Sequence, residues 1–183
     1  MYQFDIAATS AINSLSGVNF TIDTLMIWVS VIGVQILVVA VAGQWWVRIE
    51  RIHTRHVLIA TGLSFVAGLA LNQLVLLFIH RMRPYDAGLT HLLIAPSPDF
   101  SFPSDHATAT FAIAAGFLLH GFRRRGVGFL AAALLISFSR VYIGTHYFSD
   151  ALGGMATGIL AAILVGLFYR EGSRLDSLLT HIW

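Results

Sequence analysis

The stretch LMIWVSVIGVQILVVAVAG, residues 25–43, runs for 19 residues without a charged side chain. A helix that crosses the hydrocarbon core of a bilayer needs about 20 mostly apolar residues. We therefore predict a transmembrane helix over Leu25–Gly43. The whole chain fits a membrane protein, since 57% of its 183 residues are hydrophobic and 11% are charged. A soluble domain carries about 25% charged residues.

Four further segments are predicted to cross the membrane because they are also long and apolar. They are Val57–Ile79, Ser104–Gly121, Val127–Ile143 and Ala151–Tyr169. The second and third of these four are short for a span. The expected fold class is therefore all-α, a polytopic membrane helix bundle with about five transmembrane helices, in one domain over residues 1–183.

Apolar residues at helical spacing flank the predicted bundle at both ends. Before the first span they are Phe4, Ala8, Ile12 and Leu15, and after the last they are Leu175, Leu178, Leu179 and Ile182. Such stripes are typical of amphipathic helices that lie in the membrane interface. We expect one interfacial helix at each end, with a frayed terminus as the alternative at the N-terminal end.

The arginines are distributed unevenly between the two sides of the predicted bundle. Only Arg81, Arg83 and Arg140 fall on one side. The other side holds Arg48, Arg51, Arg55, Arg123, Arg124, Arg125, Arg170 and Arg174. Because cytoplasmic loops carry the excess of basic residues, the arginine-rich side is expected to be cytoplasmic and the N-terminus to lie outside.

Composition excludes several kinds of site. The chain has no cysteine, so neither a disulfide framework nor a thiolate metal site is possible. Its formal net charge is only +2, and nucleic acid is therefore not an expected partner. We also predict that the chain binds no metal and no cofactor, because few carboxylates accompany its histidines and two arginines beside them would repel a cation.

Polar residues gather at four helix ends that alternation brings to the arginine-poor face. The four ends carry Arg83, Ser104, Asp105, His106, Arg140, His146 and Asp150. Singly, the arginines are explained as snorkelling side chains and Ser104 as a helix N-cap. A charge at bilayer depth costs about 2.5–3.5 kcal/mol, however, so a whole group of them indicates pairing or a bound ligand.

The residue types in this group suit phosphoryl transfer. Arginine offers a planar fork that matches phosphate oxygens, and a helix N-terminus offers free N–H groups. His146 and Asp150 are four residues apart on one helical face, so we expect the carboxylate to fix the tautomer of a nucleophilic imidazole. His106 is then available to protonate the leaving oxygen. Positioning and charge stabilisation are most of what this reaction needs.

The 24-residue connection His80–Pro103 is expected to form an ordered cap over this face, because it contains four prolines. Asp86 and Asp99 are interpreted as solvated loop acids. Of the histidines outside the group, His91 is expected to come nearest to the site.

Three motifs carry a resemblance to a known family. Arg83-Pro84, then Pro103-Ser104-Asp105-His106, then Ser139-Arg140 followed by His146 and Asp150, resemble the three-part signature of the type 2 phosphatidic acid phosphatase superfamily. The resemblance covers roughly Val57 to Tyr169. It implies that His146 is the nucleophile, that Asp150 orients it and that His106 is the general acid. It also implies that Arg83, Arg140 and the Ser104 region hold the phosphate, without a metal.

Two positions depart from the usual signature. Leu76 stands where the superfamily has a lysine, so one phosphate contact is missing or Arg81 replaces it. Asp105 stands where the superfamily has a glycine. Both departures are similar to the bacitracin-resistance-type undecaprenyl pyrophosphate phosphatases.

This resemblance implies an enzyme of the bacterial inner (cytoplasmic) membrane, active at the extracytoplasmic face. Its substrate would be a lipid diphosphate, cleaved to the monophosphate and inorganic phosphate through a phospho-histidine, which recycles the cell-wall lipid carrier. One alternative is a phosphatidate or phosphatidylglycerophosphate phosphatase. Another is a non-catalytic anion or lipid carrier, since intramembrane charges also mark transport paths.

Overall fold

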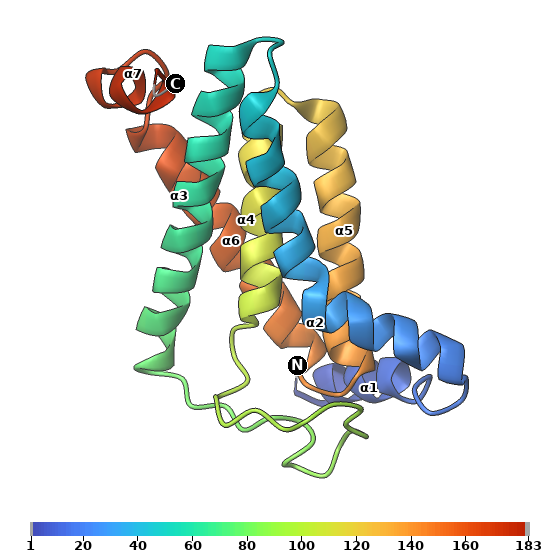
Figure 1. Ribbon diagram of the computed structural model, residues 1–183. Helices are drawn as coiled ribbons and strands as arrows, with labels where there is room; N and C mark the ends of the chain where they lie inside the picture. Colours follow the sequence, from blue (N-terminus) through green and yellow to red (C-terminus); the bar gives the residue numbers. More distant parts are fainter. Residues whose placement is uncertain (1, 182–183) are drawn as a thin grey trace.

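Helix α4, Asp105–Leu119, occupies the centre of the bundle in the computed structural model, which describes residues 2–181 (Figure 1). It packs against α3 (Arg51–Leu76), α5 (Arg123–Tyr142) and α6 (Phe148–Phe168). Helix α2 (Phe20–Ala42) packs mainly on α5 and leads to α3 through a short 3-10 helix, η1 (Gly43–Trp46). The described residues contain helices and no strand, which confirms the predicted all-α class.

Four helices of the described chain are long and apolar enough to cross a membrane. They are α2 with η1, α3, α5 and α6. Helix α4 has only 15 residues, so it is about 22 Å long, whereas the hydrocarbon core is about 30 Å thick. The third predicted span is therefore shorter than Ser104–Gly121. The short length of α4 is tolerated because it lies at the centre of the bundle, where the neighbouring helices cover most of its surface.

Helices α4 and α6 approach each other closely because two glycines of α6 face α4. A Cβ atom at Gly154 would lie 2.4 Å from the carbonyl oxygen of Ser104. A Cβ atom at Gly158 would lie 2.4 Å from the carbonyl oxygen of Thr108. This spacing of small residues lets two helix backbones touch, as in many membrane proteins. The contact places the start of α4 directly against the start of α6.

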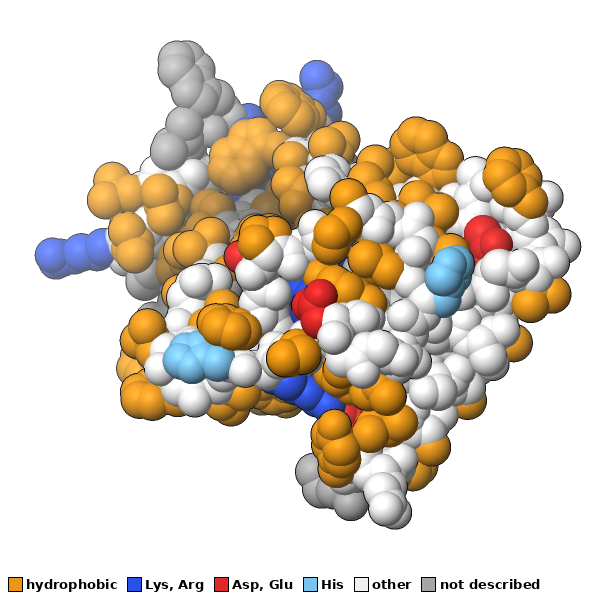
Figure 2. Space-filling model, turned by 90° about the horizontal axis from the view of Figure 1, so that it is seen from below, with side chains coloured by type: hydrophobic (Ala, Val, Ile, Leu, Met, Phe, Trp, Pro, Cys, Tyr) orange, Lys and Arg blue, Asp and Glu red, His pale blue; other side chains and the backbone are white. Residues whose placement is uncertain are grey.

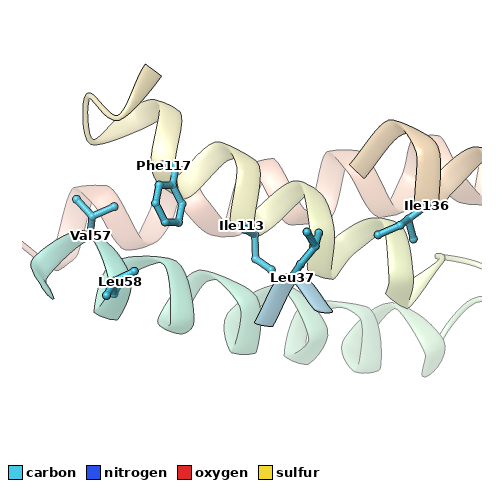
Figure 3. Close-up of a cluster of buried hydrophobic side chains, with 6 residues drawn as sticks. All are labelled: Leu37, Val57, Leu58, Ile113, Phe117 and Ile136. Carbon is cyan, nitrogen blue, oxygen red and sulfur yellow. The ribbon is translucent and has the colours of Figure 1, made fainter. Parts of the chain in front are cut away.

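A buried apolar cluster joins the long helices (Figure 3). Its members come from α2, α3, α4 and α5, and they are Leu37, Val57, Leu58, Ile113, Phe117 and Ile136. This packing leaves the polar residues of the helix ends outside the apolar core.

The two terminal helices, α1 (Tyr2–Asn13) and α7 (Arg174–Thr180), lie at opposite ends of the bundle (Figure 1). Both were predicted, and the alternative of a frayed N-terminus is wrong. In α1 the polar face packs on the protein, however, since Asp5 is buried while Phe4 is 69% exposed. Helix α7 is built in the same way, with Asp176 buried and Leu178 exposed. The last residue of the predicted C-terminal stripe, Ile182, lies outside the described residues.

Candidate active site

Four helix ends meet at the end of the bundle opposite α7, as alternation predicted. The ends of α3 and α5 and the starts of α4 and α6 lie there, beside the long connection between α3 and α4 (Figure 1). Figure 2 looks onto this end and shows acidic and basic side chains in the middle of a largely hydrophobic and uncharged face.

A cavity of about 240 Å³ opens between these helix ends. Its lining consists of Gln73, Leu76, Arg83, Ser97, Asp99, Phe100, Pro103, Asp105, His106, Arg140 and His146. Five of these residues were predicted site residues, and they come from four separate parts of the chain. The cavity therefore brings two arginines and two histidines together.

His146 is held in one tautomer by the backbone. Its Nδ1 lies 2.8 Å from the carbonyl oxygen of Ser101. A carbonyl only accepts hydrogen bonds, so Nδ1 must carry the proton and Nε2 carries the lone pair. Nε2 lies 3.4 Å from Nη1 of Arg83 at the cavity. The ring is thus arranged as a nucleophile requires.

Asp150 acts on His146 differently from the prediction. Its Oδ2 is 3.5 Å from Nδ1 of His146, which is farther than the Ser101 carbonyl, so Asp150 does not set the tautomer. The fully buried carboxylate instead accepts hydrogen bonds from Ser101 Oγ, from the backbone N–H of Tyr147 and from Arg81. What Asp150 provides is a negative charge behind the imidazole. The contact of Ser101 with His146 was not predictable, because a backbone carbonyl leaves no signal in the residue type.

The surroundings of His146 favour its neutral form. Burial lowers the pKa of His146, and the charges of Arg140 and Arg83 lower it further, although Asp150 opposes them. A neutral imidazole near pH 7 is the reactive form of this side chain.

The two cavity arginines are buried, and within residues 2–181 neither is at salt-bridge distance from a carboxylate, although the side chain of Asp105 lines the same cavity. Arg83 donates to the carbonyl oxygens of Asp99 and Thr145, at 2.8 and 3.0 Å. Arg140 donates to Ser30 Oγ on α2 at 2.7 Å, and its Nε has no hydrogen-bond partner within residues 2–181. A buried cation without a counter-charge is costly. An anion in the cavity would bring a further negative charge to these two arginines.

The start of α4 offers further donors to such an anion. Ser104 occupies the N-cap position, but its side chain makes no capping hydrogen bond. Its hydroxyl is fully buried and has no partner within the described part of the chain. The next residue, Asp105, accepts a hydrogen bond from Asn72 Nδ2 of α3 at 2.7 Å. Ser104 is absent from the cavity lining, whereas Asp105 and His106 belong to it, so the first turn of α4 is the part of this helix that faces a ligand there.

Arg81 does not replace the lysine that the family signature has at the position of Leu76. Leu76 lines the cavity, whereas Arg81 points behind His146 and donates to Asp5 and Asp150. The contact between Arg81 and Asp5 was not predictable from the sequence, because Asp5 lies 76 residues before Arg81.

The long connection also differs in detail from the sequence interpretation. Asp99 is exposed, as expected of a solvated acid, but it also lines the cavity, and its carbonyl oxygen accepts a hydrogen bond from Arg83. His91 was expected near the site, but it is absent from the cavity lining. The backbone of His91 is instead bonded to Asn13 of α1. Gln73, one turn before Leu76, lines the cavity and was not predicted.

Known proteins share both the motifs and the fold of this chain. The chain matches the PAP2 superfamily over residues 57–173. It is 35% identical to undecaprenyl-diphosphatase BcrC of Bacillus subtilis over 166 residues, which cover 87% of this chain and 80% of that protein. It is 28% identical to the putative undecaprenyl-diphosphatase YbjG of Escherichia coli over 134 residues, covering 73% of this chain and 66% of that protein.

A solved structure has the same arrangement of helices. The crystal structure of a PAP2 type phosphatidylglycerolphosphate phosphatase from Bacillus subtilis superposes with a TM-score of 0.68 at 25% identity. The superposition covers 94% of this chain and 88% of that one. Because the family match spans most of the chain and includes all three motifs that line or support the cavity, the chain belongs to the PAP2 superfamily.

Proposed function

We propose that this chain is an integral-membrane phosphatase that hydrolyses a polyprenyl diphosphate, such as undecaprenyl diphosphate, to the monophosphate and inorganic phosphate. The observation that carries the proposal is the Nε2 lone pair of His146 beside Arg83, in a cavity that also holds Arg140 and His106. Similarity to BcrC supports a diphosphate as the substrate. Such a reaction would return the lipid carrier of cell-wall synthesis to use.

The reaction takes two displacements at the terminal phosphorus. Arg83, Arg140 and the start of α4 neutralise the terminal phosphate while Nε2 of His146 attacks in line. The bond from phosphorus to the bridging oxygen breaks, and its electron pair leaves with the polyprenyl monophosphate. His106 can supply a proton to that oxygen. Water, deprotonated by His106, then attacks phospho-His146 and releases inorganic phosphate and the neutral imidazole.

We place the cavity at the extracytoplasmic face of the bacterial cytoplasmic membrane. Eight arginines lie towards the opposite face, and the positive-inside rule makes that face cytoplasmic. The cysteine-free chain makes a labelling test simple, with one cysteine introduced at the exposed Asp86 of the cavity end or at the exposed Arg124. In intact cells a membrane-impermeant maleimide should label Asp86→Cys and leave Arg124→Cys unlabelled. The reverse pattern would put the cavity on the cytoplasmic side.

Hydrolysis is expected to need no divalent metal ion. Within residues 2–181, no three histidine, cysteine or carboxylate side chains lie close enough to hold one. Phosphate release from a polyprenyl diphosphate should therefore continue at the same rate in excess EDTA, with an EDTA-treated sample resupplied with magnesium as the control. A rate that falls in EDTA and returns with magnesium would contradict the metal-free mechanism.

The same assay distinguishes the lipid substrates. A phosphatidylglycerophosphate phosphatase is the second candidate, because the solved PAP2 type phosphatidylglycerolphosphate phosphatase of Bacillus subtilis superposes over 94% of this chain. We expect faster turnover of the polyprenyl diphosphate than of phosphatidylglycerophosphate or phosphatidate under matched detergent conditions. Faster turnover of a monoester would identify a phospholipid monoester as the substrate, and the chain would still be a phosphatase.

A further inference from the structure

Helix α1 presses three buried polar side chains against the elements that carry the active site. Asp5, Thr9 and Asn13 recur every four residues, so they share one face of the helix. Buried polar groups are costly unless they are hydrogen-bonded, and all three are bonded to parts of the chain far away in sequence. Helix α1 lies outside the segment that matches the family, residues 57–173.

Asp5 is linked through Arg81 to Asp150, which lies behind His146. Its Oδ2 accepts a hydrogen bond from Arg81 Nη2 at 2.5 Å, and Arg81 Nη1 donates to Asp150 Oδ1 at 2.7 Å. Asp5 also accepts from the backbone N–H and the hydroxyl of Ser149, at 2.8 and 2.6 Å. One guanidinium therefore bridges two carboxylates directly behind His146.

The charges in this bridge bear on the reaction. Phospho-His146 and the attacking imidazole both gain positive charge, which the carboxylate of Asp150 stabilises. Arg81 alone would cancel that negative charge, whereas Asp5 balances Arg81 and leaves the group with one net negative charge. Burial raises the pKa of Asp5, but hydrogen bonds from Arg81 and Ser149 outweigh it and hold the pKa below its usual value. Asp5 is therefore ionised at neutral pH.

The other two residues of the face hold neighbouring parts of the site. Thr9 Oγ1 accepts a hydrogen bond from the backbone N–H of Phe148, at the start of α6. Asn13 bonds both backbone groups of His91 and the carbonyl oxygen of Tyr142. The His91 carbonyl sits against Gly144, where φ is +83° and a Cβ atom would lie only 2.4 Å from that oxygen. Gly144 lies in the turn between Arg140 and His146, so α1 supports both sides of this turn.

We propose that Asp5 is a positioning residue for phosphate hydrolysis, which offsets the charge of Arg81 and through Arg81 holds Asp150 in place behind His146. The N-terminal helix is then a working part of the active site although it contributes nothing to the cavity lining. This inference rests on the proposed function.

The test uses Asp5→Asn in the full-length protein. Asparagine keeps an oxygen that accepts from the backbone N–H of Ser149 but removes the charge that faces Arg81, so the contact between α1 and the start of α6 survives. We expect kcat for a polyprenyl diphosphate to fall on the order of 10- to 100-fold, with little change in KM, because Asp5 does not reach the cavity. Gln3→Ala, an exposed position on the same helix, is the matched control and should keep the wild-type kcat.

A double variant tests the route through Arg81. If Asp5 acts through Arg81, Asp5→Asn combined with Arg81→Gln should lose no more activity than Arg81→Gln alone. Each kcat is expressed per folded enzyme, counted from the burst of polyprenyl monophosphate in the first turnover. Should Asp5→Asn fail to fold, Arg81→Gln tests the same bridge from its other end and is expected to lower kcat with KM retained.

The outcomes separate the inference from the proposed function. Wild-type kcat in Asp5→Asn, or in Arg81→Gln if that variant alone folds, overturns the positioning role. If the fold losses in kcat of the two single variants multiply in the double variant, Asp5 does not act through Arg81. Activity that survives His146→Ala overturns the proposed function instead, whatever Asp5→Asn does.

Discussion

His146→Ala is expected to abolish phosphate release from every lipid that the chain hydrolyses, with a fall in kcat of at least about 10⁴-fold. In the proposed mechanism the His146 imidazole forms the covalent bond to phosphorus, and an alanine side chain cannot form it. The measurement is release of inorganic phosphate from a polyprenyl diphosphate in detergent micelles. Thermal unfolding of the purified variant is the folding control, and an unfolding temperature like that of the wild type excludes misfolding as the cause of the loss.

Trapping the intermediate makes this result specific. Acid quenching during turnover should leave acid-labile, base-stable phosphate on the wild-type protein and none on His146→Ala. His91→Ala is the control, since the His91 ring is exposed and only its backbone is held by Asn13. Phosphate trapped on His146→Ala would identify a different nucleophile and end the proposed mechanism.

His106→Ala is expected to affect monoester and diphosphate substrates very differently. A diphosphate expels a phosphate oxygen, whose second pKa is about 6. A monoester expels an alkoxide, whose conjugate acid has a pKa of about 15.7 if water is the guide. The monoester therefore needs a proton donor in the transition state, and general acid catalysis contributes about 10²- to 10⁴-fold. We expect kcat/KM to fall by that factor on phosphatidate and by much less on a polyprenyl diphosphate.

The informative quantity is the ratio of the two kcat/KM values, measured in the same detergent. His91→Ala should leave this ratio unchanged and serves as the control here too. Equal losses on both substrates in His106→Ala would show that His106 does not protonate the leaving oxygen and acts only by shaping the cavity.

Much of the arrangement was predictable because membrane helices alternate in direction. Once five apolar segments are recognised, alternation alone places Arg83, His106, Arg140 and His146 at one face. The cavity lining agrees with this expectation. The predicted class of fold follows from the same segments, although α4 is shorter than Ser104–Gly121 because Ser104 is its N-cap and His120 is its C-cap.

The contacts that support the site were not predictable. The tautomer of His146 depends on the carbonyl oxygen of Ser101, and every residue type has such a carbonyl. Arg81 meets Asp5 only because α1 folds back across the start of α6. The amphipathic pattern of α1 predicted a helix but not which face packs, because at a membrane interface the apolar face can turn to lipid while the polar face turns to the protein.

The glycines at 154 and 158 let backbone contact set the distance between the helix starts near His106 and His146. His106 lies in the first turn of α4 and His146 just before α6, and these two helices touch backbone to backbone. Leucine or phenylalanine rotamers elsewhere can adjust without widening that contact. We therefore expect the distance between the two histidines to change little when a bilayer thins or thickens and the outer helices tilt.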